Sequence, residues 1–106
     1  MLPKKFRLPL DRFSRKRWLS LQSASFLLKF LDNRLGYNRF GIIISAKAER
    51  KSVKRNFWRR RFMERIKSWP NLSRDFLIIV SPKVKYMNLV KLEGELAATV
   101  RKLAGH

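Results

Sequence analysis

The sequence predicts a single α+β domain, in which helices pack on one sheet in the order α-β-β-β-α-β-α. Three observations favour this fold. Four short segments alternate between apolar and polar residues or are continuously apolar, as strands are. Two longer segments repeat apolar residues every three or four positions, as amphipathic helices do. The chain has 106 residues, of which 45% are hydrophobic, so 1–106 is expected to form one domain.

The first third of the chain predicts an arm, a short helix and two strands. Residues 1–10 contain two prolines and three basic residues and are expected to form an extended basic arm. Residues 11–18 can form a short helix with Asp11 as its N-cap. Residues 19–32 carry two strand-like pieces, although 25–32 is also compatible with a helix.

The middle of the chain predicts a strand followed by a long helix. Residues 39–45 are rich in isoleucine and predict a strand. Ser52 is expected to cap a helix over 53–69, which Pro70 ends. The apolar positions of this helix repeat at helical spacing and predict its buried stripe: Trp58, Phe62, Ile66 and Trp69.

The last third predicts a strand and a helix. Residues 75–81 form a continuous apolar run, which is typical of a strand buried on both faces. Asn88 is expected to cap a final helix over 88–104. The strand at 39–45 and this strand, with the long helix between them, form a βαβ unit.

Charge is the unusual property of this chain. It has 26 Lys and Arg residues against 7 Asp and Glu residues, a formal net charge of +19. The positive side chains repel one another unless a polyanion neutralises them. We therefore expect a polyanionic partner, either a nucleic acid or an acidic membrane. The chain has no cysteine, its one histidine is His106, and its acids are scattered singly. We therefore expect no catalytic residue and no metal or cofactor bound by the protein itself.

The predicted long helix is the most basic segment. Residues 50–67 contain nine Lys or Arg residues and one acid. Like charges at helical spacing repel, so a solvated surface helix would mix the two signs. Arginine forks suit phosphate oxygens, which favours RNA as the partner. Phe57 points away from the apolar stripe and is either an ordinary surface residue or a platform for an unpaired base.

Three motifs stand out along the chain. They are the opening Met1-Leu2-Pro3-Lys4-Lys5-x-Arg7-Leu8, the segment Arg39-Phe40-Gly41 followed by an apolar strand and Lys47, and the helix Lys54-Arg55-Asn56-Phe57-Trp58-Arg59-Arg60-Arg61-Phe62-Met63-Glu64. In this order, they resemble the protein subunit of bacterial ribonuclease P. The chain departs from the family at Phe57 and Met63, where arginines are usual, and at Arg17, where an aromatic residue is usual.

The resemblance implies a fold like the second domain of ribosomal protein S5, with a left-handed βαβ crossover. It implies that a catalytic RNA holding Mg²⁺ cleaves precursor tRNA at its 5′ end, and that the protein binds both RNAs. The residues implied to bind the catalytic RNA are Lys54, Arg55, Asn56, Arg59, Arg60, Arg61 and Lys67. Those implied to line a cleft for the single-stranded 5′ leader are Phe13, Arg17, Phe40 and Lys47.

Three other functions are compatible with a basic chain. A structural RNA-binding protein would use the same helix without a substrate cleft. A membrane-active protein would leave an apolar helix face exposed, and a protein nuclease would need the acids or histidines that this chain lacks. No secretory signal or membrane-spanning stretch is recognisable, so we expect a cytoplasmic protein with no membrane partner and no obligatory protein partner.

Overall fold

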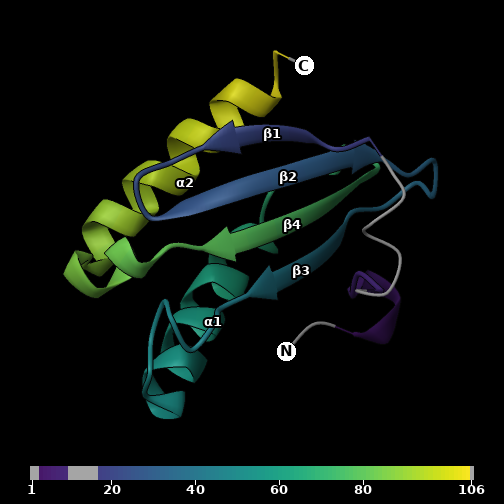
Figure 1. Ribbon diagram of the computed structural model, residues 1–106. Coiled ribbons are helices and arrows are strands. Elements are labelled where there is room, and N and C mark those ends of the chain that lie inside the picture. The colour runs from purple at the N-terminus through teal and green to yellow at the C-terminus, as the bar shows by residue number, and fades with distance from the viewer. Residues whose placement is uncertain (1–2, 10–16, 106) are drawn as a thin grey trace.

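The computed structural model describes residues 3–9 and 17–105. It contains one four-stranded sheet with two α-helices on the same face (Figure 1). The elements in chain order are the 3-10 helix η1 (Lys4–Phe6), β1 (Leu19–Gln22), β2 (Phe26–Asp32), β3 (Arg39–Ile43), α1 (Ser52–Ile66), β4 (Arg74–Val80), the 3-10 helix η3 (Pro82–Tyr86) and α2 (Leu89–Leu103). The predicted α+β domain is confirmed. The helix predicted over 11–18 falls mainly outside the described residues.

The sheet is mixed, with the strand order β1-β2-β4-β3. β1 pairs with β2 and β2 with β4 in antiparallel fashion, while β3 and β4 are parallel. α1 connects the two parallel strands, which is the predicted βαβ unit. The segment 25–32, which could also have formed a helix, contains the strand β2. Its apolar residues alternate between the two faces of the sheet.

The core lies between the sheet and the two helices. Alternate residues of the strands face the helices, among them Phe26 on β2 and Phe76 on β4. α1 contributes Trp58, Phe62 and Ile66, three of the four residues of its predicted stripe. α2 contributes Leu92, Leu96 and Leu103. The burial of this apolar stripe holds α1 against the sheet and turns its charged residues outward.

The ends of α1 differ from the prediction. Lys51, not Ser52, is the N-cap, and its side chain makes no capping hydrogen bond. The helix ends at Ile66, before the predicted end, because the hydroxyl of Ser68 donates to the carbonyl of Arg65 (2.7 Å) and the chain turns there. Trp69 still reaches the core, where its ring meets Phe76 at 5.3 Å.

The predicted cap of α2 is confirmed. The side chain of Asn88 accepts a hydrogen bond from the backbone N–H of Lys91 at 2.9 Å. The helix starts at Leu89, directly after this residue.

The described part of the N-terminal arm packs beside β3 rather than extending away. The N–H of Leu8 donates to the carbonyl of Phe40 (3.0 Å), and the Leu8 side chain is buried. Lys4–Phe6 form one 3-10 turn, and the rings of Phe6 and Tyr37 meet edge to face at 5.4 Å. The expectation of a wholly extended arm is therefore wrong, because Phe6 and Leu8 bury apolar surface against the domain.

Candidate nucleic-acid interface

The surface of α1 that faces away from the core carries a basic groove. We call it the Asn56 groove, and its lining residues are Arg7, Asn56, Arg59, Arg60, Met63, Glu64 and Lys67. Successive turns of α1 place its members on one side of the helix, and the docked N-terminal arm adds Arg7. Arg59 donates to the side-chain oxygen of Asn56 (3.1 Å), which orients both groups in the groove. Four cationic side chains thus share one surface with a single carboxylate.

Two of the predicted RNA-binding arginines are engaged within the protein. The guanidinium of Arg55 donates to the backbone carbonyls of Glu49 and Arg50, at 2.9 Å each, and so holds the loop that precedes α1. Arg61 donates to both carboxylate oxygens of Glu64 (3.1 and 3.3 Å) and lies 4.8 Å from the centre of the Phe57 ring. The predicted RNA-binding residues therefore divide into two groups. Asn56, Arg59, Arg60 and Lys67 line the Asn56 groove, whereas Arg55 and Arg61 make contacts within the protein.

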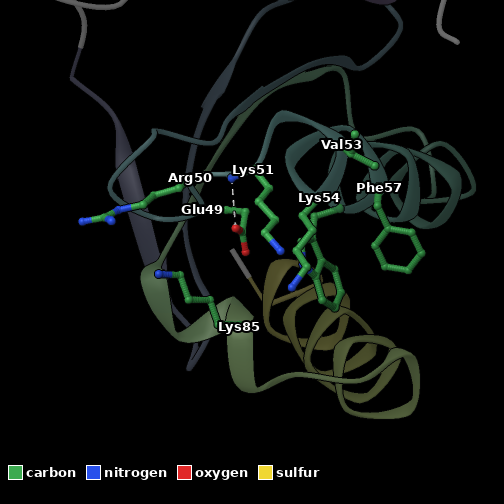
Figure 2. A pocket seen from close by; sticks show the side chains of 8 residues that line it. Glu49, Arg50, Lys51, Val53, Lys54, Phe57 and Lys85 are labelled. Atoms are coloured by element: carbon green, nitrogen blue, oxygen red, sulfur yellow. Dashed lines mark hydrogen bonds between the residues drawn. The ribbon is translucent and has the colours of Figure 1, made fainter.

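A second groove lies on another side of α1, at its N-terminal end (Figure 2). We call it the Phe57 groove, and its lining residues are Glu49, Arg50, Lys51, Val53, Lys54, Phe57, Trp58 and Lys85. Lys54, predicted to bind RNA with the others, lines this groove and not the Asn56 groove. An adjoining hollow shares Arg50 and Lys85 with it and adds Lys47.

Sequence reasoning missed Arg7, Glu49 and Lys85 as members of these grooves. Lys85 belongs to η3, which lies far from α1 along the chain. The only signal in the sequence was the general excess of basic residues, which does not say which of them meet.

The predicted leader cleft is assembled only in part. Lys47 is exposed in the loop after β3, and Arg17 is exposed before β1. Phe40 is a core residue with 6% exposure, and its ring stacks on Phe76 at 5.5 Å. It also lines a pocket with Phe6 and Tyr37. Its strand position points it to the helix-covered face, and its predicted role in a leader cleft stays a prediction. Phe13 lies outside the described residues.

Two further features of the described ranges 3–9 and 17–105 bear on function. They contain no group of three or more His, Cys, Asp or Glu side chains placed to hold a metal ion. Neither α1 nor α2, the long helices in this part of the chain, is sufficiently long and apolar to span a bilayer.

Comparison with known proteins gives one family. The model of the ribonuclease P family matches residues 11–104 of this chain. The structure of the RNase P protein from Thermotoga maritima is 24% identical, with a TM-score of 0.77, over 91% of this chain and 96% of that chain. A Staphylococcus aureus RNase P protein mutant, described as having defective mRNA degradation activity, is 26% identical, with a TM-score of 0.81, over 96% of this chain and 90% of that chain. No curated protein sequence matches the chain.

Proposed function

The chain belongs to the ribonuclease P protein family and is a subunit of ribonuclease P involved in tRNA 5′ processing, and we propose that its part is to bind RNA while the partner RNA performs the chemistry. The observation that carries this proposal is the Asn56 groove. Arg7, Arg59, Arg60 and Lys67 line it together, and its one acid, Glu64, already pairs with Arg61.

The Asn56 groove suits the backbone of a folded RNA. Guanidinium groups donate charge-assisted, often paired hydrogen bonds to phosphate oxygens. Each neutralised phosphate releases counterions, which supplies affinity at low salt. The amide of Asn56 offers both a donor and an acceptor and can therefore contact a ribose or a base edge. We assign Asn56, Arg59, Arg60 and Lys67 to the catalytic RNA. Arg55 holds the loop before α1, and Arg61 pairs with Glu64. Lys54 lines the Phe57 groove and is assigned to the RNA bound there.

The single-stranded 5′ leader of precursor tRNA is proposed as the second RNA ligand. Lys47, Arg50 and Lys85 form an exposed cationic surface at the end of β3, beside α1. Such a surface follows the phosphates of an unpaired strand, which has no fixed helical shape. Arg17 precedes β1 at the other end of the sheet, where β3 starts, and is therefore a predicted leader contact away from this surface. Phe13 stays a predicted leader contact.

The chemistry of cleavage is assigned to the partner RNA and to the Mg²⁺ ions that it holds. The protein would lower the Mg²⁺ requirement, because its +19 charge offsets the repulsion between catalytic RNA and substrate. The reaction would take place in the cytoplasm, with no obligatory second protein.

Reconstitution tests this proposal. The purified chain, a bacterial ribonuclease P RNA and a 5′-labelled precursor tRNA are mixed at a Mg²⁺ concentration where the RNA alone is nearly inactive. Cleavage at the mature 5′ end is expected only when the protein is present. The variant Arg59→Ala/Arg60→Ala is expected to lose this stimulation, since it removes two cations from the Asn56 groove.

The matched control is Arg101→Ala/Lys102→Ala, which removes the same charge from exposed positions in the last turn of α2. Stimulation that falls equally in both variants would show a general charge effect and contradict the assignment to α1. Tight RNA binding without stimulation would identify a structural RNA-binding protein instead. Cleavage by the protein alone would contradict the proposal that the partner RNA performs the chemistry.

A further inference from the structure

The Phe57 groove contains a buried acid with an unused hydrogen-bonding capacity. The side chain of Glu49 is only 6% exposed, yet it lines the groove. Its Oε1 accepts a hydrogen bond from the N–H of Lys51 at 3.2 Å. Within the described residues its carboxylate makes no other hydrogen bond and no ion pair of 4.0 Å or less. Its second oxygen, Oε2, is not one of the fully buried, unpaired side-chain atoms of the described residues, so it is accessible and can accept from a ligand.

Cations surround this carboxylate. Arg50, Lys51, Lys54 and Lys85 line the same groove (Figure 2). The groove has a volume of about 590 Å³, within the range of small-ligand sites. A polyanionic strand with hydrogen-bond donors on its bases matches both features, because phosphates meet the lysines while a base edge meets the carboxylate.

Phe57 supplies an aromatic surface at the other end of the groove. The residue is 40% exposed. The guanidinium of Arg61 lies 4.8 Å from the centre of its ring and the ring of Trp58 meets it edge to face at 5.2 Å, so two neighbours hold it in place. Figure 2 shows Phe57 beyond Lys54 as seen from Glu49. Because Lys54 lies between them, we assign the two groups to neighbouring nucleotides.

The carboxylate selects among the bases. It only accepts hydrogen bonds, and two oxygens accept best from two adjacent donors. Guanine alone presents such a pair, N1–H and the N2 amino group, on its Watson–Crick edge. Adenine, cytosine and uracil each place an acceptor beside their donor, and that acceptor would be repelled by the second carboxylate oxygen. An unpaired guanosine is thus the preferred ligand.

We propose that the Phe57 groove binds two consecutive unpaired nucleotides of the precursor tRNA 5′ leader, with a guanine edge on Glu49 and the adjacent base stacked on Phe57. The leader is favoured because the groove is continuous with the Lys47 surface through Arg50 and Lys85. A single strand also leaves its base edges unpaired. The inference rests on the proposed function, which it extends with a base preference.

The base preference is measured on the isolated protein. Fluorescence anisotropy follows the binding of short labelled oligouridylates that carry one central guanosine, inosine or adenosine, at a salt concentration where oligouridylate itself binds weakly. The guanosine strand is expected to bind about tenfold more tightly than the adenosine strand. Inosine lacks the N2 amino group and should fall between them. Equal affinities for the guanosine and adenosine strands would overturn the proposal.

Variants assign the preference to its residues. Glu49→Gln keeps an acceptor for the N–H of Lys51 but presents a donor to guanine, and it should abolish the preference. Glu93→Gln changes the net charge equally at an exposed ion pair outside the groove and should retain the preference. Phe57→Ala should weaken all strands about tenfold and leave the preference unchanged. A preference that survives Glu49→Gln would contradict the assignment, and circular dichroism checks that each variant is folded.

The reconstituted enzyme separates this inference from the function on which it rests. Precursor tRNAs with a uridine-only leader and with guanosines in the leader are compared for binding to the complex of wild-type or Glu49→Gln protein with the RNA. A guanosine effect seen only with wild-type protein supports the proposal. Normal stimulation of cleavage without any guanosine effect refutes the groove assignment alone. Absence of stimulation by the wild-type protein refutes the proposed function itself.

Discussion

Arg39 and Asp75 form a two-point ion pair between the parallel strands β3 and β4, with Nε–Oδ1 and Nη2–Oδ2 distances of 2.8 Å each. The hydrogen bond to Asp75 raises the pKa of Arg39 above its ordinary value. Asp75 is 1% exposed and also accepts from the side chain of Asn33 at 2.9 Å. The two residues are register partners, so the pair ties the edge strand to the centre of the sheet. β3 leads directly into the basic loop and α1, and its position therefore sets that of the grooves.

Asp75→Asn is expected to destabilise the domain by about 3 kcal/mol, because it leaves the Arg39 charge partly buried without its partner. The free energy of unfolding in urea measures this loss. The control is Asp32→Asn, since Asp32 pairs with Arg74 at the surface and is 76% exposed at its side chain. That control should cost less than about 1 kcal/mol. An equal loss of unfolding free energy in both variants would show that the Arg39–Asp75 pair stabilises the domain no more than a surface pair.

A second polar contact, partly buried, joins α2 to the turn between β1 and β2. One oxygen of Glu95 accepts from the Ser23 hydroxyl (2.5 Å), the Ser25 N–H (2.9 Å) and the Ser25 hydroxyl (3.1 Å). Glu95→Gln should lower the free energy of unfolding by about 2 kcal/mol, because hydrogen bonds to a charged acceptor are weakened. Glu93→Gln on the same helix serves as the comparison. If the Glu93 variant lost as much, the network around Glu95 would not be what holds α2.

Arg60 and Arg55 are expected to differ in RNA binding although both belong to the basic helix. Arg60→Ala should weaken binding to the catalytic RNA and reduce the slope of log affinity against log salt by about one, since one phosphate contact is lost. Arg55→Ala should instead lower the free energy of unfolding by about 1–2 kcal/mol, because it removes two hydrogen bonds to the loop. Salt titrations and urea unfolding of both variants check this. A larger salt effect in Arg55→Ala would reverse the assignment.

Leu8 is expected to anchor the N-terminal arm. Its side chain is 8% exposed, and its backbone pairs with β3. Leu8→Ala should destabilise the domain by about 2 kcal/mol through lost burial. It should also weaken RNA binding, because Arg7 would leave the Asn56 groove. Lys4→Ala, at an exposed position of the same arm, should not change the free energy of unfolding measurably.

Much of the fold could be predicted from local pattern. The alternation in 26–32 and the apolar run near 76–80 correspond to β2 and β4, and the stripe of Trp58, Phe62 and Ile66 is the buried face of α1. Asn88 caps α2 as expected. These features depend on neighbours a few residues apart, and hydrophobic burial at a fixed period determines them.

The ends of elements and the arm could not be predicted in this way. Ser52 has the right residue type for a cap, yet the helix begins at Ser52 itself after Lys51. The arm has basic and proline residues like a disordered terminus, yet Leu8 is buried. In the arm, the contact of Leu8 with β3 outweighs the local preference, whereas local pattern alone does not determine the exact first residue of a helix.

The sequence by itself determined the α+β class and the basic character of α1, because these follow from composition and from the period of apolar residues. Only the tertiary structure decided which charges act together. It turned Arg55 inward to the loop, placed Phe40 in the core, and brought Glu49 and Lys85 to one groove. Their meeting depends on the parallel pairing of β3 with β4 and on the path of η3 after it, which bring together residues that are far apart in the chain.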